Sequence, residues 1–208
     1  MIVHESILTD TQRRVLRVVA PFARRAGFYL AGGTAVALRF GHRRSDDFDW
    51  FIQALPRPDV LLSEMNALGV PLQDTQTEAG TLIGWVDGVK VSFFEYRYPL
   101  LDALDMWPEY DIHLASVRDM GAMKLLAIAQ RGSRKDFVDV HELLRNGVPL
   151  RGMLDDFREK LGADPVSALR GLTYFDDAEA EPMPEMLKAF DWRELRAALG
   201  QAVREVVR

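Results

Sequence analysis

The chain has no cysteine among its 208 residues. Disulfide bonds and thiolate metal sites are therefore excluded, and the composition fits a reducing compartment. Long hydrophobic runs are missing as well. The most apolar stretch near the N-terminus, "VLRVVAPF", is interrupted by Arg17 and Pro21, and a membrane-spanning helix needs roughly 20 apolar residues. We therefore expect a soluble, cytoplasmic protein with no membrane partner.

Basic residues are in the minority, and the formal net charge is −5. The first 44 residues nevertheless hold eight arginines and two acids, a balance of +6, so the other 164 carry −11. A protein that binds nucleic acid over its whole surface is usually basic throughout. Two interpretations of the N-terminal arginines stay open: one basic face for a polyanion, or the solvated face of a helix.

The N-terminal half alternates helical and extended patterns. Apolar spacing predicts helices over 9–26, 33–40 and 57–69. Pro21 lies inside the first of them, where we expect a kink or an early end, because proline cannot donate the helical hydrogen bond. Short apolar runs predict strands over 28–32, 47–52 and within 70–98, where Asp87-Gly88 indicates a hairpin.

Beyond about residue 112 the sequence is helical in pattern. Helices are predicted within 116–132, 133–147, 150–162, 165–175 and 191–208. Ser116 and Asp119 have the spacing of a capping box. The sequence therefore predicts an α/β (α+β) fold in two parts: an α/β core with its N-terminal helix at 1–112, and a helical region at 113–208.

The segment "YLAGGTAVALRFGHRRSDDFDWF" at 29–51 carries the first chemical signal. A strand, two glycines and a helix start follow one another. Glycine lets the backbone approach a ligand closely, and the free N–H groups of a helix N-terminus favour an anion. Such a junction binds phosphate in many proteins, although a plain structural turn explains two glycines equally well.

Three aspartates follow in the same segment. In an extended strand, Asp47 and Asp49 point to one face, about 6.5 to 7 Å apart, while Phe48 and Trp50 point to the opposite, buried face. Two carboxylates this close repel each other unless a cation lies between them, and Mg²⁺ prefers oxygen ligands. Asp46 points away from them. The alternative is a polar edge strand with its acids in solvent.

These motifs resemble the nucleotidyltransferase superfamily, whose signature joins Gly-Gly or Gly-Ser to Asp-x-Asp. The Gly-Gly-Thr opening and the Arg-x-Ser-x-Asp-x-Asp ending are similar to the AbiEii/AbiGii-type toxin nucleotidyltransferases of bacteria. The matching residues are Gly32, Gly33, Thr34, Arg43, Ser45, Asp47 and Asp49. The resemblance implies a mixed sheet with flanking helices, nucleotide binding by Gly32, Gly33, Thr34 and Ser45, and metal binding by Asp47 and Asp49.

A second block, "KLLAIAQRGSRKDFVDVHELL", resembles the downstream motif of the same family. Lys124 matches its phosphate-contacting lysine, and Asp139 matches the position treated as an active-site aspartate. Asp136 and Asp139 share a helix face, so ordinary ion pairs with Arg131 and Arg134 also explain the block. A lone lysine in an apolar stripe needs an anionic partner or a route to solvent.

One position departs from the family pattern. Many nucleotidyltransferases place a third carboxylate on a later strand, and the position that matches it here is Ser92. Glu95 lies three residues further on and faces the other side of a regular strand unless a bulge intervenes. Either two carboxylates hold the metal with substrate oxygens, or Glu95 or Asp139 assists them.

The resemblance implies the toxin of a toxin–antitoxin pair, an enzyme that uses Mg²⁺ and an NTP to add nucleotides to RNA, with the tRNA 3′ end as the expected acceptor. Its catalytic residues would be Asp47, Asp49, Lys124 and Asp139. A cognate antitoxin protein is a further implied partner. Candidate RNA contacts are Arg43, Arg44, Arg131 and Arg134.

Two other classes share these motifs. One is a nucleotidyltransferase that modifies a small molecule or a protein. The other is a degenerate module that binds nucleotide without catalysis, which Ser92 suggests. Only RNA binding should weaken steeply with salt, which separates the RNA-directed enzyme from the first alternative.

Overall fold

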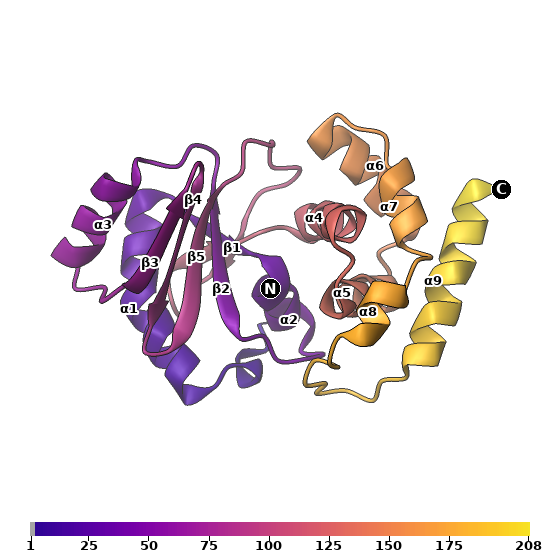
Figure 1. Ribbon diagram of the computed structural model, residues 1–208, viewed down its shortest axis with the longest axis horizontal. Coiled ribbons are helices and arrows are strands. Elements are labelled where there is room, and N and C mark those ends of the chain that lie inside the picture. The colour runs from indigo at the N-terminus through magenta and orange to yellow at the C-terminus, as the bar shows by residue number, and fades with distance from the viewer. Residues whose placement is uncertain (1–2) are drawn as a thin grey trace.

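A mixed seven-stranded sheet is the centre of the N-terminal half (Figure 1). The structure, a computed structural model, describes residues 3–208. The strands are β1 (Tyr29–Ala31), β2 (Asp47–Ile52), β3 (Gln73–Glu78), β4 (Thr81–Val86), β5 (Val89–Glu95), β6 (Asp105–Trp107) and β7 (Ile112–Leu114). Their order is β3-β4-β5-β2-β1-β7-β6. The β2–β5 and β1–β7 pairs are parallel and the remaining pairs are antiparallel. The predicted α/β fold class is confirmed.

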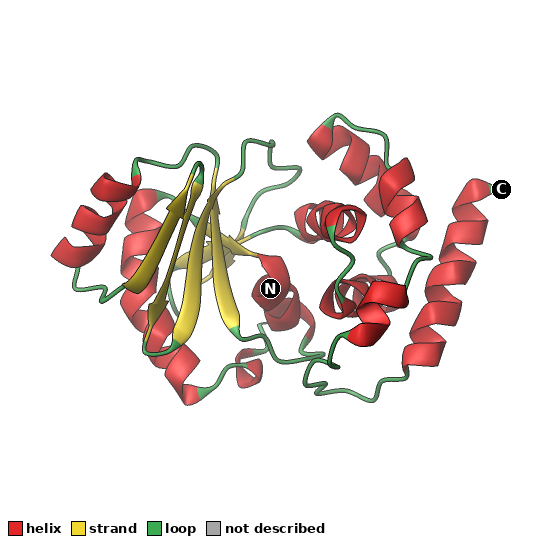
Figure 2. Cartoon of the chain, viewed as in Figure 1, coloured by secondary structure: helices red, strands yellow, loops and turns green. Residues whose placement is uncertain are grey.

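Helices cover both faces of this sheet and build the whole C-terminal half (Figure 2). They are η1 (Glu5–Ile7), α1 (Asp10–Ala26), α2 (Gly32–Phe40), α3 (Pro58–Ala67), α4 (Val117–Gln130), α5 (Arg134–Arg145), α6 (Leu150–Leu161), α7 (Val166–Gly171), α8 (Asp176–Ala180) and α9 (Trp192–Val207). In Figure 1, α1 and α3 lie on one side of the sheet, and α2 with the C-terminal helices lies on the other. None of the helices within 3–208 combines the length and hydrophobicity of a membrane-spanning segment.

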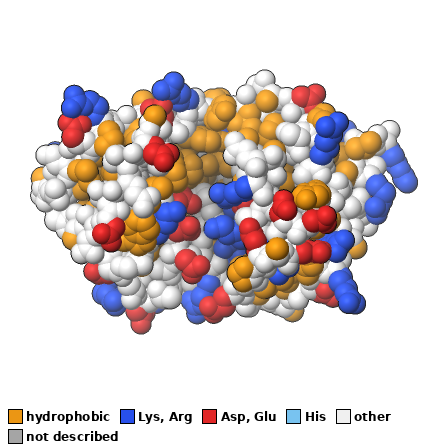
Figure 3. All heavy atoms as spheres, viewed as in Figure 1, with side chains coloured by type: hydrophobic (Ala, Val, Ile, Leu, Met, Phe, Trp, Pro, Cys, Tyr) orange, Lys and Arg blue, Asp and Glu red, His pale blue; other side chains and the backbone are white. Residues whose placement is uncertain are grey.

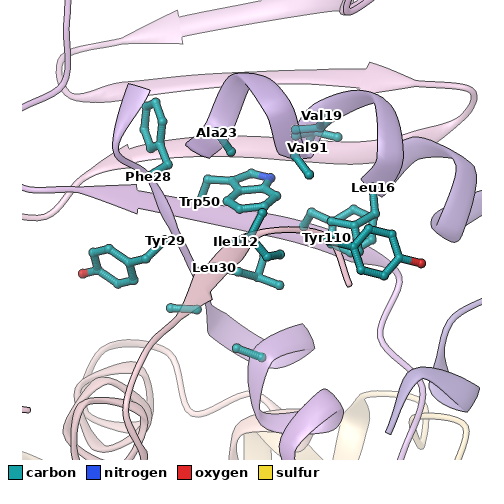
Figure 4. Close-up of a cluster of buried hydrophobic side chains, with 14 of the residues drawn as sticks. Leu16, Val19, Ala23, Phe28, Tyr29, Leu30, Trp50, Val91, Tyr110 and Ile112 are labelled. Atoms are coloured by element: carbon teal, nitrogen blue, oxygen red, sulfur yellow. The ribbon is translucent and has the colours of Figure 1, made fainter. Parts of the chain in front are cut away.

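The central strand β2 shows the predicted alternation. Phe48 and Trp50 are fully buried, whereas Asp47 and Asp49 on the opposite face are only partly so. Figure 4 shows Trp50 beside Val19 and Ala23 of α1. The apolar back of the strand therefore fixes which way the two carboxylates point.

The helix α1 corrects one expectation. The helix does not end or break at Pro21. It continues to Ala26, and its C-cap is Gly27, whose φ is +81°. Proline removes the hydrogen bond to the carbonyl four residues earlier, at Arg17. Both residues are exposed, so water can satisfy that carbonyl. The helix begins with a full capping box between Thr9 and Gln12.

Two chain segments pair in a way that no local pattern predicts. The loop after α2 forms an isolated antiparallel bridge with the segment before α9, between Arg43 and Met186. The Arg44 N–H donates to the Glu185 carbonyl at 2.8 Å, and the Leu187 N–H donates to the His42 carbonyl at 2.9 Å. The helical half is thereby attached to the loop that precedes β2.

We expect Phe48→Ala to lower the free energy of unfolding by about 3–5 kcal/mol, because it empties a fully buried site on the back of β2. Urea denaturation would measure the loss. Val18→Ala, on the exposed side of α1, is the control and should change stability by less than about 0.5 kcal/mol. Equal effects of the two substitutions would contradict the assignment of the buried face.

Candidate active site

The junction of β1 and α2 brings backbone close to charged side chains. Gly32 has φ +68°, and a Cβ there would lie 2.7 Å from Oδ2 of Asp49. A Cβ on Gly33 would lie 2.6 Å from a guanidinium nitrogen of Arg43. The positive φ and the close carboxylate together require glycine at position 32, and a side chain at position 33 would displace the Arg43 guanidinium. No side chain caps the N-terminus of α2, so its N–H groups are available to an anion.

Asp47 and Asp49 line a cavity of about 390 Å³ together with both glycines and Lys124. In Figure 3, acidic and basic side chains face each other across a hollow between the two halves of the molecule, with hydrophobic side chains along its upper rim. Asp46 is exposed and lies outside this cavity. The predicted separation of the three aspartates is confirmed.

Electrostatics favour a cation beside these carboxylates. Burial, with the nearby charge of Asp47, raises the pKa of Asp49 to about 6. A metal ion would relieve this repulsion, and the oxygen donors suit Mg²⁺. Within residues 3–208, however, no group of three histidine or acidic side chains is placed to hold a metal. The two aspartates thus fit a cation whose remaining ligands come from water or substrate.

Strand register shows that Ser92 stands where a third carboxylate would lie. Ser92 of β5 lies directly opposite Asp49 of β2, at the position where the sequence comparison expected an acid. Its hydroxyl is fully buried next to the Asp49 carboxylate, whose pKa it acts to lower against the larger effects of burial and Asp47. Glu95 lies opposite Ile52 and accepts hydrogen bonds from the Leu55 N–H and from Arg97. Glu95 is therefore engaged away from the two aspartates.

A buried ion network lies beside the cavity. The Lys124 ammonium is 2.9 Å from Oδ1 of Asp136 and 2.6 Å from Oδ2 of Asp139. The Arg43 guanidinium donates to both oxygens of Asp139, at 2.7 and 2.8 Å. His42 Nε2 lies 2.9 Å from the same carboxylate. Asp139 is 0% exposed and Lys124 only 4%. Each of these buried charges is in direct contact with opposite charges.

The charges of this network stabilise one another. Burial acts to raise the pKa of Asp139, but the charges of Arg43 and Lys124 hold that pKa well below its usual range. Burial also acts to raise the pKa of Asp136, but Lys124 and Arg131 outweigh it and lower that pKa to about 2. Burial lowers the pKa of Lys124, but Asp139 and Asp136 outweigh it and raise that pKa. All three groups are therefore charged at neutral pH.

Three other predicted site residues, Thr34, Arg43 and Ser45, are buried beside the cavity. Thr34 is buried and its hydroxyl donates to the Asp47 carbonyl, which ties α2 to β2. Ser45 is buried, and its hydroxyl lies 3.4 Å from Oδ1 of Asp47. Arg43 is only 2% exposed and faces Asp139, so its guanidinium is not on an outer surface. The Thr34 contact holds α2 against β2, and the Arg43 contact holds the loop before β2 against α5.

The remaining arginines differ in exposure. Arg131 lines the cavity with its side chain 61% exposed, although it also pairs with Asp136 at 3.0 Å. Arg44 pairs with Glu185, and Arg134 donates to the Ala178 and Glu179 carbonyls. Of the two arginines expected to form ion pairs with Asp136 or Asp139, Arg131 does so and Arg134 does not.

Sequence reasoning missed part of the cavity wall. Lys90 adds positive charge, and Phe94 and Met123 add apolar surface. Lys90 lies opposite Asp47 in the β2–β5 register, which is visible only once the two strands are paired. Alternation along β5 would have placed Lys90, Ser92 and Phe94 on one face.

Family comparison matches residues 88–206 to the model for "Nucleotidyl transferase AbiEii toxin, Type IV TA system". The chain belongs to the AbiEii family. It is therefore a nucleotidyltransferase toxin of a type IV toxin–antitoxin system. The uncharacterized protein aq_aa25 of Aquifex aeolicus (strain VF5) is 37% identical over 201 residues, covering 95% of this chain and 97% of that protein.

Solved structures support the fold of this AbiEii protein. A crystal structure described as a nucleotidyltransferase from H. pylori superposes with a TM-score of 0.60 at 17% identity, covering 96% of each chain. The antigenic nucleotidyltransferase-like protein from Paracoccidioides brasiliensis gives a TM-score of 0.56 at 21% identity, covering 94% of this chain and 93% of that one. Both comparisons show a shared nucleotidyltransferase fold.

The Asp136 carboxylate makes a pH-dependent prediction. Its folded pKa of about 2 lies below the unfolded value of about 3.9, so its contribution is complete above about pH 4 and is lost as pH falls toward 2. Asp136→Asn should destabilise the protein by about 2 kcal/mol at pH 7, and by progressively less below pH 4. Denaturation across pH measures this. Asp10→Asn, in an exposed pair, is the control; a pH-independent loss in Asp136→Asn would contradict the prediction.

Proposed function

We propose that this AbiEii toxin transfers a nucleotide from an NTP to the 3′ end of an RNA, with tRNA as the acceptor, in a Mg²⁺-dependent reaction. The observation that carries the proposal is the composition of one cavity. A helix N-terminus with two glycines, two carboxylates on one strand face and four basic side chains converge there. Triphosphate binding and metal-assisted phosphoryl chemistry need those groups together.

Each group has a distinct task in this proposal. The N–H groups of Gly32 and Gly33 bind the triphosphate. An ammonium has three protons; Lys124 directs two of them at Asp136 and Asp139, which leaves one for a phosphate oxygen. Asp47 and Asp49 would hold Mg²⁺, which aligns the α-phosphate with the attacking hydroxyl and neutralises the leaving pyrophosphate.

Asp139 acts through its neighbours. It is fully buried, and its two oxygens hold Arg43 and Lys124 in place. We assign to it the positioning of Lys124 and of the loop that leads into β2. Its position in the family motif is thus consistent with a requirement for activity without contact to the substrate.

An RNA acceptor fits the distribution of charge at the cavity mouth. Arg131 and Lys135 are both exposed there. An RNA backbone binds such local clusters through its phosphates, even on a protein whose net charge is negative.

Transfer of label from each of the four NTPs to total tRNA, with Mg²⁺ present, would test the proposal. Asp47→Ala and Asp49→Ala should each lose more than about a hundredfold in rate, because metal positioning supplies several kcal/mol. Asp46→Ala is the matched control, since Asp46 is exposed beside the same strand, and it should retain transfer. Label in protein or in a small molecule would overturn the RNA acceptor, and no transfer at all would overturn the enzyme.

Ser92 gives a prediction for the metal site. A carboxylate at position 92 would lie beside Asp49, so Ser92→Asp should tighten Mn²⁺ binding by about tenfold or more, since affinity rises with ligand charge. Electron paramagnetic resonance of added Mn²⁺ measures the bound fraction without any substrate. Ser92→Asn is the uncharged control and should show no gain. Equal affinity of the two variants would mean that Asp49 and Ser92 do not face a common ion.

A further inference from the structure

A second cavity, of about 590 Å³, lies in the helical half beside the first one. Its walls come from the C-terminal end of α4, from α7 and from the start of α8. Gln130 and Arg131 line both cavities. A ligand in the second cavity would therefore lie next to a nucleotide in the first, with the Arg131 side chain between them.

The second cavity has the chemistry of a single-stranded nucleic-acid site. Tyr174 is 54% exposed at its edge, and an exposed aromatic ring is a surface on which a base can stack. Arg170 is exposed in the same wall, and no ion pair of its guanidinium occurs within residues 3–208. Ser167, Thr173 and Asp177 add hydroxyl and carboxylate oxygens, which suit ribose hydroxyls.

The cavity wall is built by close helix packing. A Cβ on Gly171 would lie 2.9 Å from Cγ2 and 3.0 Å from the carbonyl oxygen of Ile128. Glycine at the end of α7 therefore lets that helix approach α4 directly. This contact holds the end of α7, which carries Arg170, against the C-terminal end of α4.

We propose that this cavity binds the unpaired nucleotide next to the reacting 3′ end of the RNA acceptor, with its base stacked on Tyr174 and its phosphate at Arg170. The proposal rests on the function proposed above and extends it to the acceptor. Arg131 is already paired with Asp136, whereas Arg170 forms no ion pair within residues 3–208, so the phosphate is assigned to Arg170.

Binding of a fluorescein-labelled single-stranded oligoribonucleotide to the full chain, followed by fluorescence anisotropy, tests the cavity directly. Tyr174→Ala should weaken binding by about tenfold, and Tyr174→Phe, which keeps the stacking surface, should stay within about twofold of the native chain. Arg170→Ala should lower the slope of log affinity against log salt by about 0.7, the value for one phosphate contact on a single strand.

Arg57→Ala is the matched control, because Arg57 is exposed beside α3 at the opposite end of the molecule (Figure 1). It should change neither affinity nor slope. Binding of a fluorescent NTP should be unchanged in all four variants. Unchanged RNA affinity in both Tyr174→Ala and Arg170→Ala, or no binding of RNA by the native chain, would overturn the proposal.

These outcomes are separable from failure of the proposed function. RNA binding that depends on Tyr174 and Arg170 without any label transfer would support the cavity and refute the transferase. Normal transfer to RNA by both variants, with an unchanged KM for RNA, would support the transferase and refute the cavity.

Discussion

The buried contacts of Asp139 hold the two halves of the molecule in register. Its carboxylate lies on α5, receives Arg43 from the loop before β2, and contacts Lys124 of α4. A buried charge is tolerated only when opposite charges and hydrogen bonds surround it. The carboxylate therefore favours one arrangement of the loop and helices, and Lys124, which it contacts, lines the cavity that contains Asp47 and Asp49.

The two faces of β2 have different roles in the site. Phe48 and Trp50 bury the back of the strand against α1, while Asp47 and Asp49 occupy the front. Stability and chemistry are thus assigned to alternate residues of a single six-residue strand. The repulsion between the carboxylates is a local cost that the buried aromatic side chains offset, and a bound cation would remove it.

Local patterns were sufficient for much of this description. The spacing Asp47-x-Asp49 and the two glycines before α2 have meanings fixed by neighbouring residues alone, and the structure places them as expected. Arg43 shows the limit. Its position in a polar loop suggested an RNA contact, yet it is buried because Asp139, 96 residues later, accepts its guanidinium. Lys90 was missed for the same reason, since only strand pairing brings it opposite Asp47. Such long-range contacts leave no periodicity in the sequence.

The bridge between Arg43 and Met186 has a consequence for the synthesis of this toxin. The glycines and aspartates of the site are synthesised before residues 185–187, which pair with the loop at 42–44. Domains fold as units once their residues are available. A chain that stops before residue 185 therefore carries the glycines and aspartates of the site without the backbone partners of the loop that leads into β2.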